Sequence, residues 1–176
     1  MKTRNGAASL ASRRAGRSAM GLMQIPRRIE YALRAMIHLA DRPDGIASGI
    51  EIAQREQIPK YFLEKVIRDL MRRGLVRSRR GPGGGYQLGR PAASISFKDI
   101  IEAVEGPIVL NVCLEASSVC SLQPTCRMFQ VWEHGQQALL SVFSETNLQE
   151  IVASVPSGTP LHRLADSDSA AAQPKA

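Results

Sequence analysis

The fold of this 176-residue chain is decided by residues 79–86, which read RRGPGGGY. Leu75 and Val76 before this stretch, and Tyr86 and Leu88 at and after its end, are apolar or aromatic, as expected of short strands. Glycine and proline between two strands favour a turn. The segment therefore predicts a β-hairpin with a glycine-rich tip, the wing of a winged helix.

Two predicted helices precede this wing. Ser48, followed three residues later by Glu51, forms a capping box that predicts a short helix over residues 49–56. After a turn at residues 57–58, Pro59 opens a second helix that ends at Gly74. Two helices joined by a short turn are typical of a helix-turn-helix. The apolar residues of the second helix fall on one face at the helical period: Leu63, Val66, Ile67 and Leu70.

Further helices flank the predicted helix-turn-helix and wing. Helical patterning begins at about Arg27 and ends in turn residues at 41–45. Ser96 and Asp99 form a capping pair for a helix that Gly106 terminates. The sequence thus predicts a mainly α fold with a small β-wing.

A longer helix is predicted from about Arg127, and Thr146 with Gln149 caps a last short helix. A chain of this size has little core for the apolar stripe of the longer helix, so we expect the same helix of a second subunit to cover it. Burial within its own domain is the alternative. The stripe comprises Met128, Val131, Trp132, Ala138, Leu139, Val142 and Phe143.

Positive charge is concentrated in the first half of the chain. Residues 1–22 carry five basic residues and no acidic one, residues 23–90 carry 14 basic and 7 acidic residues, and residues 91–176 carry 4 basic against 9 acidic residues. Eight basic residues lie between Lys60 and Arg80, against two acids. Such a basic surface on a helix and a wing predicts binding to double-stranded DNA, because lysine and arginine displace counterions from phosphates.

Residues near the start of a recognition helix reach base edges in the major groove. Tyr61, Glu64 and Lys65 are the candidates here, supported by Lys60 and Arg68. Glu64 either accepts a hydrogen bond from a cytosine amino group or pairs with Arg68 on the helix surface, and both readings stay open.

The wing supplies a second group of DNA contacts. Arg79 and Arg80, at the base of the wing, are expected to reach the minor groove, where narrow tracts concentrate negative potential. Gly83 and Gly84 belong to a run of three glycines that permits positive φ and a close approach to the sugar-phosphate wall.

Composition and cysteine usage limit the class of protein. No apolar run approaches the ~18–20 residues that cross a bilayer, so no membrane span is expected. Cys113, Cys120 and Cys126 are odd in number and clustered, unlike a secreted disulfide framework, which favours a reducing, cytoplasmic location. Because close CxxC pairs are absent, structural zinc is not favoured, while thiolates are also the usual ligands of iron–sulfur clusters.

Four segments together resemble the Rrf2 family of transcription regulators: EYALRA at 30–35, GLVRSRRGPGGGYQL at 74–88, AVEGPI at 103–108, and the three cysteines that follow. The resemblance covers about residues 23–153. It implies a winged helix-turn-helix, a long dimerisation helix that makes a homodimer and, in cysteine-bearing members, an oxygen-labile iron–sulfur cluster. The state of that cluster changes affinity for a DNA operator in response to redox stress, nitric oxide or iron status.

The resemblance also suggests a fourth ligand. Some members place a histidine two residues after the third cysteine, but Phe129 stands there in this chain. Other members use a carboxylate in the first helix, supplied by the partner subunit, and the matching position is Glu30. The alternative is that Glu30 pairs with Arg34 on the helix surface. His38 and His134 are weaker candidates, the first expected to be packed and the second to lie at the surface.

Five segments are expected along the chain. A basic, disordered extension (1–22) is either an arm on DNA phosphates or precedes the true start at Met20 or Met23. It is followed by a winged helix-turn-helix domain (23–106), a cysteine-bearing cluster loop (107–126), a dimerisation helix with a short C-terminal helix (127–154) and a disordered tail (155–176). The expected cofactor is a [4Fe-4S] or [2Fe-2S] cluster.

Two rival functions remain. One is a regulator of the same fold whose cysteines act as a metal-free thiol switch. The other is an iron–sulfur electron-transfer protein or enzyme, against which stands the lack of any nucleophile–base or paired-carboxylate constellation in the sequence.

Overall fold

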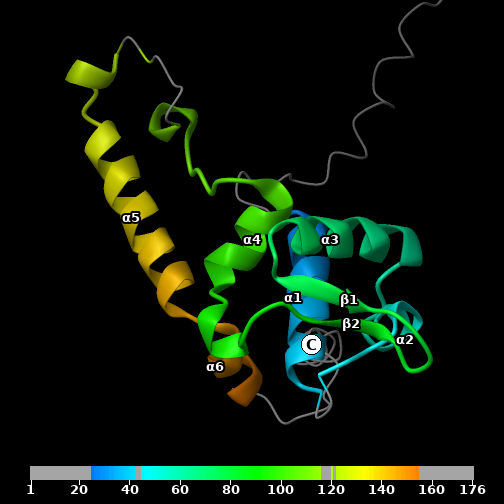
Figure 1. Ribbon diagram of the computed structural model, residues 1–176. Helices are drawn as coiled ribbons and strands as arrows, with labels where there is room; N and C mark the ends of the chain where they lie inside the picture. Colours follow the sequence, from blue (N-terminus) through cyan, green and yellow to red (C-terminus); the bar gives the residue numbers. More distant parts are fainter. Residues whose placement is uncertain (1–24, 43–44, 116–119, 121, 155–176) are drawn as a thin grey trace, which may run out of the picture.

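The computed structural model describes residues 25–42, 45–115, 120 and 122–154 (Figure 1). The expected extension at 1–22 and tail at 155–176 lie outside the described residues. The described residues form a mainly helical domain with one two-stranded antiparallel sheet, which confirms the expected fold class. The α-helices are α1 (Arg27–Ala40), α2 (Gly49–Arg55), α3 (Lys60–Arg72), α4 (Phe97–Glu105), α5 (Phe129–Glu145) and α6 (Leu148–Ala153). The strands are β1 (Val76–Arg79) and β2 (Gly85–Leu88), and the short 3-10 helices are η1 (Ala92–Ser94), η2 (Val112–Leu114) and η3 (Gln123–Thr125).

Helix α1 is the centre of the core. It packs against α3, α4, α6 and strand β2. Ala32 and Ala35 are fully buried on it, and their small side chains let neighbouring helices approach, while Met36 and Leu39 fill the space between them. The position of α1 therefore determines where α3 lies.

Helix α3 has the two faces that the sequence predicts. Leu63, Val66, Ile67 and Leu70 are all buried, while Pro59 sits at the N-cap. Gly74 follows the helix with a φ of 69°, a left-handed conformation that glycine adopts without steric cost. The polar residues of α3 are thereby left on the outer side of the domain.

The wing is longer than expected. Strand β1 extends to Arg79, which pairs with Gly85 at the far end of the ladder from Val76 and Leu88. Arg79 and Arg80 thus lie at the tip end and not at the base, so that part of the sequence prediction was wrong. The reason is that Arg77 to Arg79 continue the backbone ladder although their side chains are polar and exposed.

Two predicted caps also differ in detail. Ser48 accepts the backbone N–H of Glu51, but the Glu51 carboxylate contacts Arg42 at 2.5 Å instead of closing the box. The cap of α6 is Asn147 with Glu150, one residue later than the predicted Thr146 with Gln149. The box of Ser96 and Asp99 at α4 is formed in full, as predicted.

Helix α5 stands apart from this body (Figure 1, yellow to orange). None of its residues, all of which the structure describes, is buried. Phe143 packs on Phe97 of α4 with ring centroids 4.9 Å apart. Gln136 accepts the N–H of Leu110 and donates to the carbonyl of Ile108, which ties the segment after α4 to α5.

Candidate DNA-binding surface and cysteine segment

The outer face of α3 presents aromatic and cationic side chains. Tyr61 is 61% exposed near the start of the helix, and the Lys65 ammonium lies 4.3 Å from the centroid of its ring. The ring face attracts a cation at this distance. Lys60, Arg68 and Arg72 are also exposed on α3, so the predicted basic surface is present.

Glu64 is exposed on the same helix, but its partner is not the one considered from the sequence. Its carboxylate lies 3.9 Å from the ammonium of Lys60, and both side chains are more than half exposed. A pair this long and this exposed contributes little to stability. Glu64 is therefore free to exchange this partner for a base edge.

A hollow of about 380 Å³ separates α3 from the wing. Its α3 wall consists of Lys60, Leu63, Glu64 and Ile67, and Arg79 with Gly84 lies on the wing side. The start of α2 closes one end through Ser48, Gly49 and Ile50. The recognition helix and the wing thus face a common space.

The three wing glycines have different roles. Gly83 has a φ of 73°, with nothing within 4 Å of where a side chain would begin. A Cβ on Gly84 would lie 2.8 Å from the carbonyl oxygen of Gly81, and one on Gly85 would lie 2.7 Å from the carbonyl carbon of Ala47. Only Gly83 therefore needs positive φ, while Gly84 and Gly85 are required because the protein's own backbone passes close to them.

Asp69 is one of the two acids between Lys60 and Arg80, and it is buried. It is ion-paired with both Arg28 of α1 and Arg72 of α3, and it is only 7% exposed. Two guanidinium groups neutralise it, so it does not repel phosphates. In the sequence, the one sign of this burial is that Asp69 falls at the edge of the apolar face of the predicted helix.

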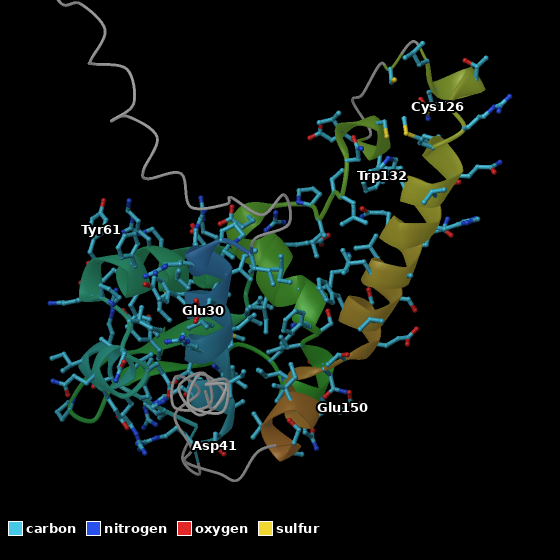
Figure 2. The ribbon with its side chains drawn as sticks, turned by 180° about the vertical axis from the view of Figure 1, so that it is seen from behind. Glu30, Asp41, Tyr61, Cys126, Trp132 and Glu150 are labelled. Carbon is cyan, nitrogen blue, oxygen red and sulfur yellow. The ribbon has the colours of Figure 1, made fainter. Side chains whose placement is uncertain are left out.

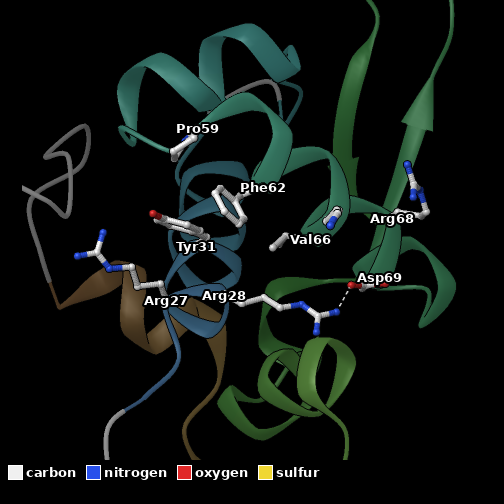
Figure 3. Close-up of a pocket in the computed structure, with 9 residues that line it drawn as sticks. Arg27, Arg28, Tyr31, Pro59, Phe62, Val66, Arg68 and Asp69 are labelled. Carbon is white, nitrogen blue, oxygen red and sulfur yellow. Dashed lines mark hydrogen bonds and ion pairs between the residues drawn. The ribbon is translucent and has the colours of Figure 1, made fainter. Parts of the chain in front are cut away.

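A larger cavity, of about 670 Å³, lies between α1 and α3 (Figure 3). Its walls combine the Tyr31 and Phe62 rings, whose centroids are 5.9 Å apart, with Pro59 and Val66. The remaining lining residues are charged: Arg27, Arg28, Lys65, Arg68 and Asp69.

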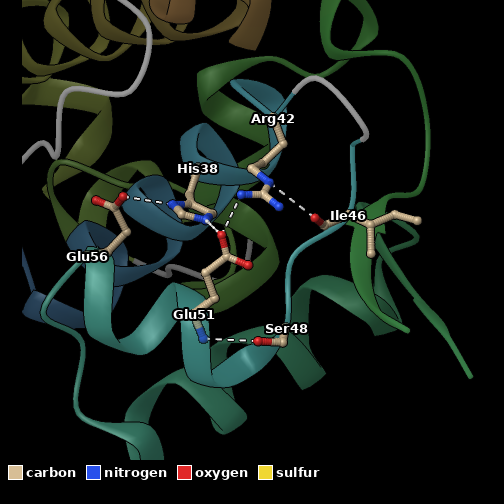
Figure 4. Close-up of polar contacts among 6 residues, drawn as sticks. All are labelled: His38, Arg42, Ile46, Ser48, Glu51 and Glu56. Carbon is tan, nitrogen blue, oxygen red and sulfur yellow. Dashed lines mark hydrogen bonds and ion pairs between the residues drawn. The ribbon is translucent and has the colours of Figure 1, made fainter. Parts of the chain in front are cut away.

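His38 belongs to a buried polar group beneath α2 (Figure 4). Its Nδ1 lies 2.9 Å from a carboxylate oxygen of Glu56, and the two residues are 7% and 5% exposed. Its Nε2 is 3.9 Å from Glu51, which also contacts Arg42. His38 is thus a packed histidine that ties α1 to the turn of the helix-turn-helix, and His134 is exposed on α5.

The three cysteines lie between α4 and α5. Cys113 is in η2, and Cys126 follows η3 just before α5; all three are free thiols of intermediate exposure. Figure 2 shows Cys126 at the far end of α5 from the body that holds Glu30. Glu30 is ion-paired with Arg34, and its side chain is 48% exposed.

The donor set suits an iron–sulfur cluster in chemistry, but one chain does not assemble it. Within the described residues, no three or more histidine, cysteine or acidic side chains converge on a metal position. Three unpaired thiols on one short segment still match the ligand type that such clusters prefer. A carboxylate on the surface of α1 is accessible to a second subunit. The three thiols therefore match the cluster's ligand type, while the described residues of one chain hold no assembled site.

The described helices include none long and apolar enough to cross a membrane.

Comparisons with known proteins agree with this architecture. The model of the Rrf2 family, described as iron-dependent transcriptional regulators, matches residues 25–154. A Mycobacterium tuberculosis protein named as an HTH-type transcriptional regulator, Rv1287, is 32% identical over 130 residues, covering 73% of this chain and 81% of its own.

Solved structures give the same result. CymR, the global cysteine regulator of B. subtilis, is 30% identical with a TM-score of 0.63, over 76% of this chain and 98% of its own. The IscR of T. potens is 27% identical with a TM-score of 0.59, over 90% and 97%. The oxidized form of Staphylococcus aureus CymR is 32% identical with a TM-score of 0.57, over 74% and 96%. These relatives are regulators and not enzymes, and the chain belongs to the Rrf2 family of winged helix-turn-helix transcription regulators.

Proposed function

We propose that the protein is a homodimeric repressor or activator that binds an operator with α3 in the major groove and the wing on the adjoining backbone. The observation that carries this proposal is the exposed basic face of α3, which shares a hollow with the wing. Recognition helices of this kind contact base edges with their first residues.

Specific contacts are assigned to the start of α3. Tyr61, Glu64 and Lys65 are exposed there and are proposed to read bases. Lys60 and Arg68 flank them, and Arg79 and Arg80 at the wing tip are proposed to reach the minor groove, with Gly83 and Gly84 against the backbone.

The apolar surface of α5 supports the homodimer. Met128, Val131 and Val142 are 59–71% exposed, and Trp132 is 37% exposed. Large apolar side chains gathered along one helix mark an interaction surface. A second α5 is the proposed partner, because a twofold axis places identical surfaces together.

The input is proposed to be an iron–sulfur cluster held by Cys113, Cys120 and Cys126 of one subunit and Glu30 of the partner subunit. When bound, such a cluster supplies a redox-active group that oxygen or nitric oxide damages. A carboxylate is a harder ligand than a thiolate and exchanges more readily. Similarity to the IscR of T. potens supports this proposal.

Helix α1 provides the connection between input and output. It carries Glu30 on its outer side and packs against α3 on its inner side. A change in what Glu30 contacts is therefore expected to move α3. Half-site separation is fixed by the ~34 Å helical repeat, so even a small change in the spacing of two α3 helices alters affinity.

DNA binding is tested by selecting duplexes from a random-sequence library and measuring fluorescence anisotropy. Glu64→Gln should change the preferred bases, while Arg79→Gln should weaken binding to all sequences. Lys98→Gln, on α4 and ion-paired with Glu102 at 3.1 Å, is the matched charge-loss control. A base preference identical in wild type and Glu64→Gln would remove Glu64 from the reading surface.

The cluster is tested by anaerobic purification followed by absorption spectroscopy and by iron and sulfide analysis. Glu30→Ala should leave the cysteines able to bind iron but make the cluster more labile. Glu102→Ala, on α4, is the control. Unchanged spectra and lability in Glu30→Ala would exclude Glu30 as a ligand.

A metal-free thiol switch is the second candidate function. It is favoured by similarity to the CymR proteins, one of which was solved in an oxidized form. A colourless, iron-free protein whose DNA affinity still changes with oxidant would establish the thiol switch and refute the cluster.

A further inference from the structure

The cavity between α1 and α3 lies on the flank of α3 opposite the wing (Figure 3). Residues of α3 that line it are Phe62, Lys65, Val66, Arg68 and Asp69, whereas Lys60, Leu63, Glu64 and Ile67 line the hollow on the wing side. The two sets share no residue. The recognition helix is therefore bordered on both sides by a depression, and only one of them belongs to the wing.

The size of a helix and of the major groove makes both flanks relevant. A helix with its side chains is about 10–12 Å wide, and the major groove is about 12 Å wide. A helix lying in the groove therefore faces a phosphate wall on each side. The wing accounts for one wall, and the cavity between α1 and α3 faces the other.

The cavity carries the charge that a phosphate wall requires. Arg27, Lys65 and Arg68 are exposed, and none of them has an ion pair with any residue that the structure describes. Arg28 is already paired with Asp69 and lies 3.6 Å from Glu105. Lys65 lies over the Tyr61 ring, so Arg27 and Arg68 remain for an external phosphate, whereas the wing-side hollow combines Lys60 and Arg79 with the acidic Glu64.

The arrangement also matches a continuous backbone and not a single ion. Figure 3 shows Arg27 at one end of the cavity and Arg68 at the other, with the Tyr31 and Phe62 rings between them. Phe62, on α3, is 47% exposed, so part of its ring is accessible to a ligand in the cavity. A DNA strand crossing here would meet a cation at each end and would lay a deoxyribose on the rings.

We propose that Arg27 and Arg68 form a phosphate strip that grips the DNA strand on the side of α3 opposite the wing, while Lys65, held over the Tyr61 ring, is left to the bases. The Arg28–Asp69 ion pair ties the start of α1 to α3, and Arg27 and Arg68 line the same cavity. The inference rests on the proposed insertion of α3 into the major groove. It assigns Arg27, outside the helix-turn-helix, to sequence-independent anchoring.

The test measures the salt dependence of binding to a random-sequence duplex by fluorescence anisotropy. The slope of log K against log salt is negative. Each lost phosphate contact should make it shallower by about 0.9, hence by about 1.8 for Arg27→Gln in a dimer. Between about 50 and 200 mM salt, wild type should then lose roughly tenfold more affinity than the variant. Arg27→Lys should retain the slope, and Lys98→Gln should match wild type.

The outcomes separate this inference from the proposed function. An unchanged slope in Arg27→Gln, with a reduced slope in Arg79→Gln, overturns the phosphate strip and leaves α3 docking intact. If neither variant changes the slope, docking through α3 and the wing fails as well. A loss in Arg27→Gln that differs between duplex sequences shows a base contact and also overturns the strip. Thermal unfolding by circular dichroism confirms that each variant is folded.

Discussion

Replacing His38 by leucine should cost about 3 kcal/mol of folding free energy at neutral pH. His38 and Glu56 are 7% and 5% exposed, and His38 provides the one side-chain hydrogen bond to the Glu56 carboxylate, at 2.9 Å, among the described contacts. Leaving a buried hydrogen-bonding group without its partner costs about 1–3 kcal/mol. Arg34 donates to the backbone carbonyl of Glu56 at 3.2 Å and supplies no hydrogen bond to its carboxylate, so we expect a cost at the upper end of this range.

The assay is urea unfolding followed by circular dichroism, together with thermal unfolding, where 3 kcal/mol lowers Tm by roughly 10 °C. The double variant His38→Leu/Glu56→Leu should regain most of the loss, because an apolar pair leaves no buried polar group without a partner. Glu51→Gln, at the more exposed end of the same group, should cost at most about 1 kcal/mol. The reasoning is refuted if the double variant is less stable than His38→Leu alone.

Three further outcomes are expected. Gly85→Ala should cost more than Gly83→Ala in urea unfolding, because its Cβ would disrupt two hydrogen bonds between Ala47 and Tyr86, at about 1–3 kcal/mol each. Gly83→Ala should cost only about 1–2 kcal/mol, for its positive φ, and a cost as large as that of Gly85→Ala would contradict the crowding argument. Gln136→Ala should release the segment before Cys113 and speed cluster loss after anaerobic loading, and an unchanged rate would show that this tie is not needed. Val131→Asp should give folded monomers in analytical ultracentrifugation, and a persistent dimer would place the subunit contact elsewhere.

The sequence predicts α3 and its surroundings well, because local signals agree there. Pro59 before the helix, Gly74 after it and four apolar residues at the helical period all indicate one element and one buried face. Ser96 and Asp99 are equally local, since their capping box closes within four residues. Where an element is determined by residues close in sequence, its caps and apolar period are sufficient to predict it.

Features that depend on distant partners were not predictable. The Glu51 carboxylate does not close the capping box because it is ion-paired with Arg42, which follows α1. Asp69 is neutralised by Arg28, 41 residues away, which no charge count along the chain could show. Arg79 lies at the wing tip because the length of a strand ladder depends on its partner strand and not on its side chains.

The candidate cluster site marks a different limit. Cys113, Cys120 and Cys126 stand out in the sequence, and the structure places them on one segment at the end of α5. Glu30 was selected by resemblance alone, and within one chain it contacts Arg34. Its proposed role needs a second subunit, because within one chain Glu30 lies on the body and Cys126 at the far end of α5.

Because the apolar side of α5 is exposed, the stability of the protein is expected to depend on its concentration. Association covers that surface only in the folded state, so by mass action the Tm of the proposed dimer rises with total protein concentration. Dilution below the dimer dissociation constant would separate the two α3 helices and remove the three thiols from the Glu30 of the partner subunit. A cell that makes more of this protein would therefore obtain subunits that are individually more stable, and not merely more numerous.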